Sequence, residues 1–214
     1  MKCFSKIAAL LVCAGALAHA GTITFASQGT AADANEWTAI GDSLAIVPHD
    51  NWAAALPGSS WVSYAPTGKP FTAGFTFTPN NFVLSFFEAL LLPEAPLVAT
   101  VTYRADDSAA LYINNVLVQP EAPQAGNTYS TCSDFAVGCL QQTELTLDIA
   151  AYLTAGANTL RFDVAQRAGW SFGLNYSGSV QYIDRDDVEE TPEPATLSMF
   201  GAALIAAGLW RRRA

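Results

Sequence analysis

The chain has 214 residues, of which 51% are hydrophobic and 14% charged, and its formal net charge at pH 7 is −9. Of the 19 acidic residues, 18 lie between Gly21 and Thr191, against 5 of the 10 basic ones, so that stretch is near −13. Such a charge repels nucleic acid and anionic lipid, and it suits an exported protein that must stay soluble. We therefore expect no nucleic-acid partner.

The first 20 residues have the pattern of a secretory signal peptide. Two lysines precede an apolar run over residues 7–17, and Ala18-His19-Ala20 offers small residues to a signal peptidase. We expect cleavage before Gly21. An uncleaved anchor is the alternative, but eleven apolar residues are too few where about 20 are needed. Cys13 raises the further alternative of a lipoprotein, which the bulky Val12 before it disfavours.

The body shows the period-two alternation of half-buried antiparallel strands. The expected strands are 22–25, 71–78, 98–103, 110–113, 116–118, 145–149, 160–164 and 180–183. Asn114-Asn115 predicts a tight hairpin, because asparagine tolerates positive φ. Residues 82–92 fit either a helix or a buried strand followed by a loop. Strands separated by turns, without alternating helices, predict an all-β sandwich.

Two segments resemble galactose-binding-like jelly rolls. Residues 104–115 place an Asp106-Asp107 turn between two strands and end in Asn114-Asn115. Residues 147–160 are similar to the fold's D-I-x-x-x-L-x-x-G-x-N-x-L segment. The resemblance implies a single jelly-roll-like antiparallel β-sandwich. Sandwiches of this kind bind sugars in some proteins and only pack in others.

Two cysteines, Cys132 and Cys139, remain after signal removal. An even count in an oxidising compartment predicts a disulfide. Closing so short a loop is worth roughly 2.5 kcal/mol in the chain-entropy treatment. We therefore expect a structural bridge and no redox or metal role.

The C-terminal end carries Pro192-Glu193-Pro194, an apolar stretch over residues 195–210 and the cluster Arg211, Arg212 and Arg213. As a helix the sixteen apolar residues would be about 24 Å long, against a hydrocarbon core of about 30 Å. Such a helix would span the membrane only if the bilayer thinned locally, or if Trp210 and the arginines anchored it at the interface. The arginines act as a membrane stop on the cytoplasmic side.

This tail resembles a PEP-CTERM sorting signal, which is found in Gram-negative bacteria that make exopolysaccharide. The resemblance implies insertion in the inner membrane, cleavage by an exosortase and delivery to the envelope, cell surface or extracellular matrix. An ordinary tail anchor is the alternative. The expected organisation is a signal peptide (1–20), a β-sandwich (21–183), an acidic linker (184–191) and a sorting signal (192–214).

Enzyme motifs are missing from the sequence. His49 is the only histidine after signal removal, and there is no G-x-S-x-G, phosphate loop or nucleotide fingerprint. We therefore predict no catalytic residue. Because two of the many carboxylates could meet in space, an unrecognised glycoside hydrolase stays open as a less favoured hypothesis.

Sugar binding needs flat apolar rings beside a few polar groups. The candidates are Trp37, Trp52, Trp61, Trp170 and Tyr176, with Trp170 in a loop-like setting at residues 168–171. The alternative for each ring is a place in the core. Asp106 and Asp107 are candidate ligands for Ca²⁺, although turn formation is the more ordinary role of such residues.

The sequence thus predicts an exported, non-catalytic envelope or matrix protein whose sandwich associates with exopolysaccharide or another surface glycan. The rival hypothesis is a structural surface or biofilm matrix protein without a sugar site.

Overall fold

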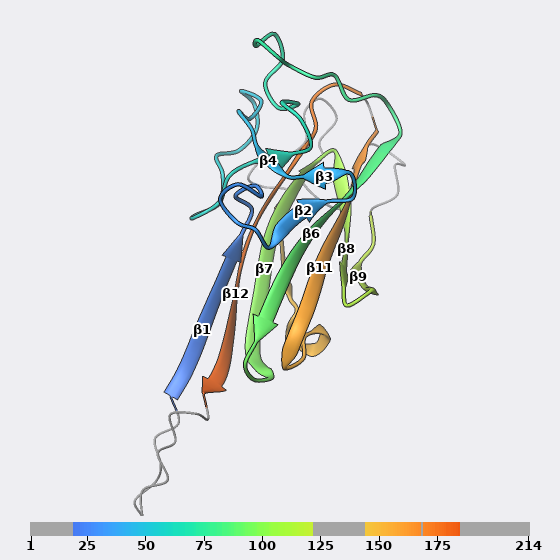
Figure 1. Cartoon of the computed structure of the whole chain (residues 1–214). Coiled ribbons are helices and arrows are strands. Elements are labelled where there is room, and N and C mark those ends of the chain that lie inside the picture. The colour runs from blue at the N-terminus through green and yellow to red at the C-terminus, as the bar shows by residue number, and fades with distance from the viewer. Residues whose placement is uncertain (1–18, 122–143, 168, 185–214) are drawn as a thin grey trace, which may run out of the picture. The chain divides into compact units, whose positions relative to one another are not determined.

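The computed structural model describes residues 19–121, 144–167 and 169–184. They form two six-stranded sheets that face each other (Figure 1). Sheet A contains β1 (His19–Ala26), β4 (Leu44–Ala45), β5 (Val62–Ser63), β7 (Pro96–Asp106), β10 (Leu145–Asp148) and β12 (Gly173–Asp184). Sheet B contains β2 (Glu36–Thr38), β3 (Gly41–Asp42), β6 (Phe82–Leu92), β8 (Ser108–Ile113), β9 (Val116–Gln119) and β11 (Gly156–Gln166).

The long strands cross from one sheet to the other at each turn. β6, β7 and β8 alternate between the sheets, and so do β10, β11 and β12, with a short 3₁₀ turn (Ala150–Tyr152) between β10 and β11. In sheet B, β11 lies between β6 and β8; in sheet A, β7 lies between β10 and β12. The predicted all-β, jelly-roll-like sandwich is confirmed.

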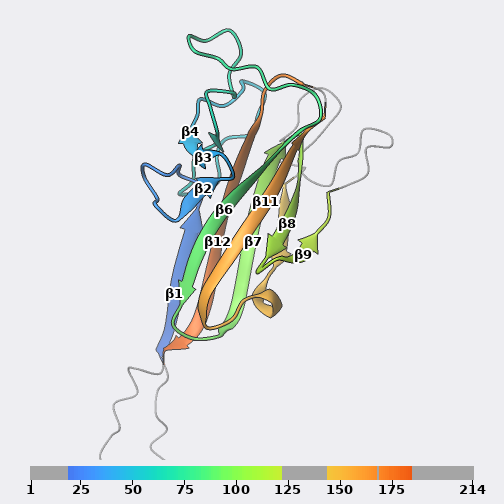
Figure 2. The ribbon, with the colours of Figure 1, turned by 45° about the vertical axis from the view of Figure 1, so that its right-hand side comes forward.

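β1 and β12 lie side by side in sheet A and run in opposite directions (Figure 1, Figure 2). The first residue of β1 and the last residue of β12 are consequently at the same end of the sandwich. The loop between β5 and β6 and the turn between β11 and β12 are at the other end in both views.

The core forms where the inner faces of the sheets meet. Along β6, alternate side chains such as Leu84, Phe86 and Leu90 are buried, while Val83 and Leu91 are exposed. The ambiguous segment 82–92 is therefore a strand. Phe162 of sheet B stacks on Tyr176 of sheet A with their ring centroids 4.9 Å apart.

The two segments that resemble jelly rolls meet around one buried amide. Asn114 and Asn115 form the β8–β9 turn with φ of 51° and 65°, as the hairpin prediction requires. The Asn114 amide donates to Asn158 Oδ1 at 2.9 Å, and Asn158 Nδ2 donates to the Thr154 carbonyl at 2.7 Å. Asn158 thereby closes the loop that leads into β11.

The prediction of a strand over residues 71–78 is wrong. Phe71 and Gly74 have φ of 60° and 80°, and the Phe75 N–H donates to the Thr72 carbonyl across a turn at 3.1 Å. Only Thr78 forms a bridge, to Trp170. The alternation of phenylalanines therefore reflects a shared contact with Trp170 and not a pleated strand.

Candidate functional site

Four aromatic rings gather at the end of the sandwich where β11 turns into β12. We call this group, Phe71, Phe75, Phe77 and Trp170, the aromatic tip. The Trp170 ring centroid lies 5.8 Å from that of Phe71, 6.2 Å from that of Phe75 and 5.8 Å from that of Phe77. Phe71 is 92% exposed, Phe77 52% and Trp170 44%. Because exposed apolar groups often mark interaction sites, the aromatic tip is a candidate binding surface.

Backbone contacts hold Trp170 in place. Its N–H donates to the Thr78 carbonyl and its carbonyl accepts from the Thr78 N–H, each at 3.0 Å. The Gly169 N–H donates to Gln166 Oε1 at 3.0 Å. Trp170 itself has a φ of 141°, which a non-glycine residue rarely adopts. Sequence reasoning found Trp170 through its loop setting, but it missed the phenylalanines by assigning them to a strand.

The other predicted sugar-stacking residues are in the core. Trp52 is 7% exposed, Trp61 1% and Tyr176 0%. Trp52 and Trp61 pack on each other with their ring centroids 4.4 Å apart, and the Trp61 indole N–H donates to the Ala53 carbonyl at 3.0 Å. A ring packed inside the sandwich has no free face for a sugar, so these three are corrected to core residues.

Asp106 and Asp107 lie at the crossover from β7 to β8 and are both buried. The Trp52 indole N–H donates to Asp106 Oδ2 at 3.0 Å, and the Arg167 N–H donates to Asp107 Oδ2 at 2.6 Å. Among residues 19–121, 144–167 and 169–184, no group of three or more His, Cys, Asp or Glu side chains is arranged to hold a metal ion. Through these hydrogen bonds both aspartates hold the crossover from β7 to β8 in place.

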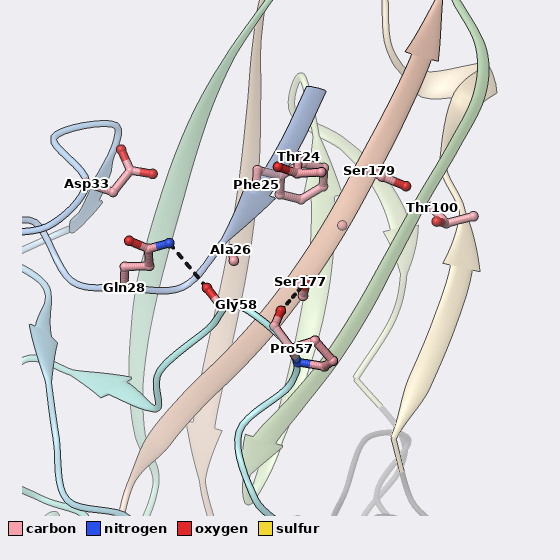
Figure 3. Close-up of a pocket in the computed structure, with 11 residues that line it drawn as sticks. Thr24, Phe25, Ala26, Gln28, Asp33, Pro57, Gly58, Thr100, Ser177 and Ser179 are labelled. Carbon is pink, nitrogen blue, oxygen red and sulfur yellow. Dashed lines mark hydrogen bonds between the residues drawn. The ribbon is translucent and has the colours of Figure 1, made fainter. Parts of the chain in front are cut away.

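A second concave region lies on sheet A, and sequence reasoning missed it. It is an open cleft of about 550 Å³. Its floor is formed by outward side chains of β1, β12 and β7, among them Thr24, Ser179 and Thr100 (Figure 3). Loop 28–35 with Gln28 and Asp33 borders it, as does a turn at residues 56–59. Residues from four separated parts of the chain meet here, so no local sequence motif predicts the cleft.

A buried asparagine anchors the turn beside the cleft. Asn175 is 0% exposed; its Oδ1 accepts from the Leu56 N–H at 2.9 Å and its Nδ2 donates to Ser59 Oγ at 2.7 Å and the Ser60 carbonyl at 3.0 Å. Ser27 Oγ also donates to the Ser60 carbonyl, at 2.7 Å. This network fixes the turn against β1 and β12.

A buried glutamate anchors the loop on the other side. Glu36 Oε2 accepts from the Gln28 N–H at 2.7 Å and the Gly29 N–H at 2.8 Å, and its Oε1 accepts from Ser43 Oγ at 2.6 Å. Burial raises the pKa of Glu36, while these three hydrogen bonds oppose the rise.

Glu88 of β6 is the register neighbour of Glu36 and is also buried. The Tyr176 hydroxyl donates to Glu88 Oε2 at 2.8 Å. Burial raises the pKa of Glu88 to about 8, so this carboxyl is protonated at neutral pH. Burial, together with the neighbouring acids, also raises the pKa of Tyr176 well above its usual range.

The outer face of sheet B carries a further row of rings. Trp37 stacks on Phe87 with centroids 5.2 Å apart, and the Arg161 guanidinium lies 4.0 Å from the Tyr112 ring centroid. These residues are successive register neighbours across β2, β6, β11 and β8. Trp37, the remaining tryptophan candidate, is 36% exposed.

Several predicted sites fall outside the described residues. These are Ala18, the cysteines Cys132 and Cys139, the motif Pro192, Glu193 and Pro194, and the cluster Arg211, Arg212 and Arg213. Ala20 and Gly21, on either side of the expected cleavage point, lie in β1. No helix in the parts of the chain that the structure describes is long and apolar enough to cross a membrane.

The C-terminal end matches a known family model. Residues 190–213 carry a PEP-CTERM protein-sorting motif. The matched span begins two residues before the predicted motif and ends at Arg213. A PEP-CTERM motif indicates a secreted protein that is sorted through the envelope to the cell surface and processed by an exosortase. The sorting motif says nothing about the chemistry of the sandwich.

The sequence matches none of the curated proteins. The structure is similar to part of the Streptomyces avermitilis alpha-L-rhamnosidase complexed with L-rhamnose, with 19% identity and a TM-score of 0.43 over 60% of this chain. That similarity spans only 11% of the rhamnosidase. It is also similar to a family 35 carbohydrate binding module from Clostridium thermocellum, with 15% identity and a TM-score of 0.40 over 73% of this chain and 97% of the module. A CBM35 from Paenibacillus barcinonensis gives 15% identity and a TM-score of 0.36 over 76% of this chain and 99% of that one.

Proposed function

We propose that this chain is an exported, non-catalytic protein of the cell envelope or extracellular matrix that binds exopolysaccharide through the aromatic tip. The sorting motif at residues 190–213 supports delivery to the surface. The observation that carries sugar binding is the half-exposed Trp170, held by paired hydrogen bonds to Thr78 and flanked by three phenylalanines. Such a ring is presented without needing to be ordered on binding, which lowers the entropic cost of association.

The neighbouring carboxyl groups of Glu36 and Glu88 are unsuited to glycoside hydrolysis. Glycoside hydrolysis needs two carboxyl groups that flank the bond to be cleaved. Glu36 and Glu88 are neighbours, but they are 0% and 2% exposed, so neither meets a substrate in solvent. Their hydrogen bonds bind them to the protein's own backbone and to Tyr176.

Calorimetry tests the proposal. The full-length chain, kept soluble in a mild detergent, is titrated with the producing organism's exopolysaccharide, with Ca²⁺ and with chelator. We expect saturable heat that Trp170→Ala weakens at least about tenfold, or about 1.4 kcal/mol. The matched control is Trp37→Ala, which removes another half-exposed indole, on sheet B. Equal losses in both variants, or no heat with the unmodified chain, would exclude the aromatic tip as a sugar site.

A second candidate function is a structural surface or matrix protein that packs with copies of itself. The observation that favours it is the outer face of sheet B, where Val83 is 52% exposed, Leu91 75% and Trp37 36%. Sedimentation of the same samples decides between the two. Assembly that grows with concentration in the absence of glycan, and that Leu91→Ser weakens, supports the structural role.

A further inference from the structure

We propose that the cleft on sheet A is a second binding site, and that its ligand is a neutral saccharide. The site is separate from the aromatic tip. Trp170 precedes β12 by three residues, and Ser177 is the fifth residue of that strand. At about 3.3 Å per residue, the part of the strand from Gly173 to Ser177 extends over about 13 Å. The inference goes beyond the function proposed above, because either site could bind without the other.

The size and shape of the cleft fit a saccharide. A cleft of about 550 Å³ lies within the range of roughly 300–1,000 Å³ that small-ligand sites occupy. It lies across three neighbouring strands, β1, β12 and β7, which form a rigid floor. Sites on strands hold their polar groups more precisely than sites on loops.

The chemistry of the lining selects the ligand class. Hydroxyl groups of Thr24, Thr100, Ser177 and Ser179 dominate the floor, and loop 28–35 adds one amide and one carboxylate. No lysine, arginine or histidine is among the lining residues, so a phosphate or a carboxylate would find no counter-charge. A lipid chain would leave the hydroxyls without partners. An uncharged ligand that is rich in hydroxyl groups can form hydrogen bonds with the lining residues.

Several floor hydroxyls are available to a ligand. Within the described residues, no protein hydrogen bond is formed by the side chains of Thr24, Thr100 or Ser179. Elsewhere on the same outer face the hydroxyls of Thr102 and Thr146 pair with each other at 2.8 Å. The hydroxyls of Thr24, Thr100 and Ser179 therefore offer donors and acceptors to a ligand, whereas those of Thr102 and Thr146 bond to each other.

Both sides of the cleft are fixed before any ligand binds. Asn175 holds the turn at 56–59, and Glu36 holds the start of loop 28–35 through two backbone N–H groups. Gln28 Nε2 donates across to the Gly58 carbonyl at 3.2 Å (Figure 3). Buried polar networks cost free energy unless every member is satisfied, and once satisfied they hold one geometry. Their position on both sides of the cleft indicates that its shape is held rigid.

The test isolates the cleft by removing the tip. The full-length Trp170→Ala chain in mild detergent is titrated with three neutral probes: cellohexaose, laminarihexaose and mannohexaose. Dextran sulfate serves as the anionic comparison. The cleft variant is Thr24→Val/Thr100→Val, which removes two hydroxyls at nearly constant volume. The matched control is Thr102→Val on the same face. Circular dichroism and thermal unfolding verify that each variant is folded.

We expect at least one neutral probe to bind the Trp170→Ala chain, to protect residues 24–33 and 56–60 from hydrogen exchange, and to lose about tenfold in affinity in the cleft variant. Thr102→Val should bind as tightly as its parent. If Trp170→Ala abolishes all binding, the cleft site is overturned and the tip stands. If only the cleft variant weakens binding, the cleft stands and the tip fails. If the unmodified chain binds no probe, the cleft site is overturned.

Discussion

The aromatic tip and the cleft present two kinds of surface on one sandwich. The tip is built from exposed rings on turns, and Thr78 supplies the paired backbone hydrogen bonds that hold its tryptophan. The cleft is built from small hydroxyl side chains on strands, and its borders are held by the buried side chains Glu36 and Asn175. Changes at the tip should therefore alter binding with little effect on folding, whereas changes beneath the cleft should alter both.

The largest expected effect is a dependence of stability on pH through Glu88. Its pKa is about 8 in the folded chain against 4.5 normally, so between these pH values the unfolded chain releases a proton that the folded chain keeps. Stability should therefore fall as pH rises from about 4.5 to about 8, by up to about 5 kcal/mol at 1.36 kcal/mol per unit. Urea unfolding at several pH values measures it.

Glu88→Gln should flatten most of this dependence, because the amide cannot ionise. Tyr176→Phe should extend it to higher pH, because the Tyr176 hydroxyl stabilises the ionised form of Glu88. A wild-type chain whose stability stays constant between pH 5 and pH 8 would contradict the assignment of a protonated, buried Glu88.

A smaller effect is expected from Asn175→Ala. The change leaves the buried Leu56 N–H and Ser60 carbonyl without their amide partner, so it should cost about 2–4 kcal/mol in the free energy of unfolding. Ser177→Ala, two residues along the same strand, should stay within about 0.5 kcal/mol because it removes one long hydrogen bond of 3.3 Å. Equal costs in denaturant unfolding would mean that the turn at 56–59 is not anchored by Asn175.

An intermediate effect is expected from Gly169→Ala at the tip. Gly169 has a φ of 70°, and an added Cβ would lie 2.2 Å from Asn80 Oδ1. The variant should lose about 1–2 kcal/mol and shift the Trp170 ring, which near-ultraviolet circular dichroism reports. Adding Asn80→Ala should recover the part of the stability loss that comes from the clash. It should not recover the part that comes from the positive φ at residue 169. Full recovery of the free energy of unfolding would show that the positive φ at residue 169 does not destabilise an alanine there.

The smallest effect on stability should come from Trp170→Ala itself. Because its ring is 44% exposed and packs on phenylalanines that are largely in solvent, the loss should be about 1 kcal/mol or less. The matched core variant Trp61→Ala should lose about 3–5 kcal/mol, since Trp61 is 1% exposed. A large loss at Trp170 would mean that the tip is part of the folding core, and the contrast between the two regions would fail.

Much of the sandwich could be predicted because its strands carry a local signal. Residues 98–103, 145–148 and 160–164 alternate in hydrophobicity and lie in strands. The same rule failed for residues 71–78, where aromatic residues alternate but the backbone turns at Phe71 and Gly74. When every second residue is hydrophobic, those side chains often share the same neighbours. A pleated strand is only one backbone arrangement that produces this pattern.

The candidate sites were less predictable than the fold. Trp170 could be found because a glycine before it marks a turn. Trp61 also follows a turn signal, the run Pro57-Gly58-Ser59-Ser60, yet it packs on Trp52 in the core. Whether an indole is buried depends on which strands cover it, and that is decided by contacts between residues far apart in the chain.

The all-β class, the Asn114-Asn115 turn and the sorting motif could all be predicted, because each depends on residues that are neighbours in the chain. The contacts of Trp170 with the three phenylalanines of the tip became visible only in the folded chain. The same holds for the way in which β1, β7, β12 and two loops enclose the cleft. At the cleft, β12 lies beside β1 and β7, whose cleft residues are more than 70 positions away in the chain. At the tip, the bridge between Thr78 and Trp170 joins residues 92 positions apart. Strand pairing and burial depend on contacts across the whole sandwich, whereas turns and motifs depend on neighbouring residues.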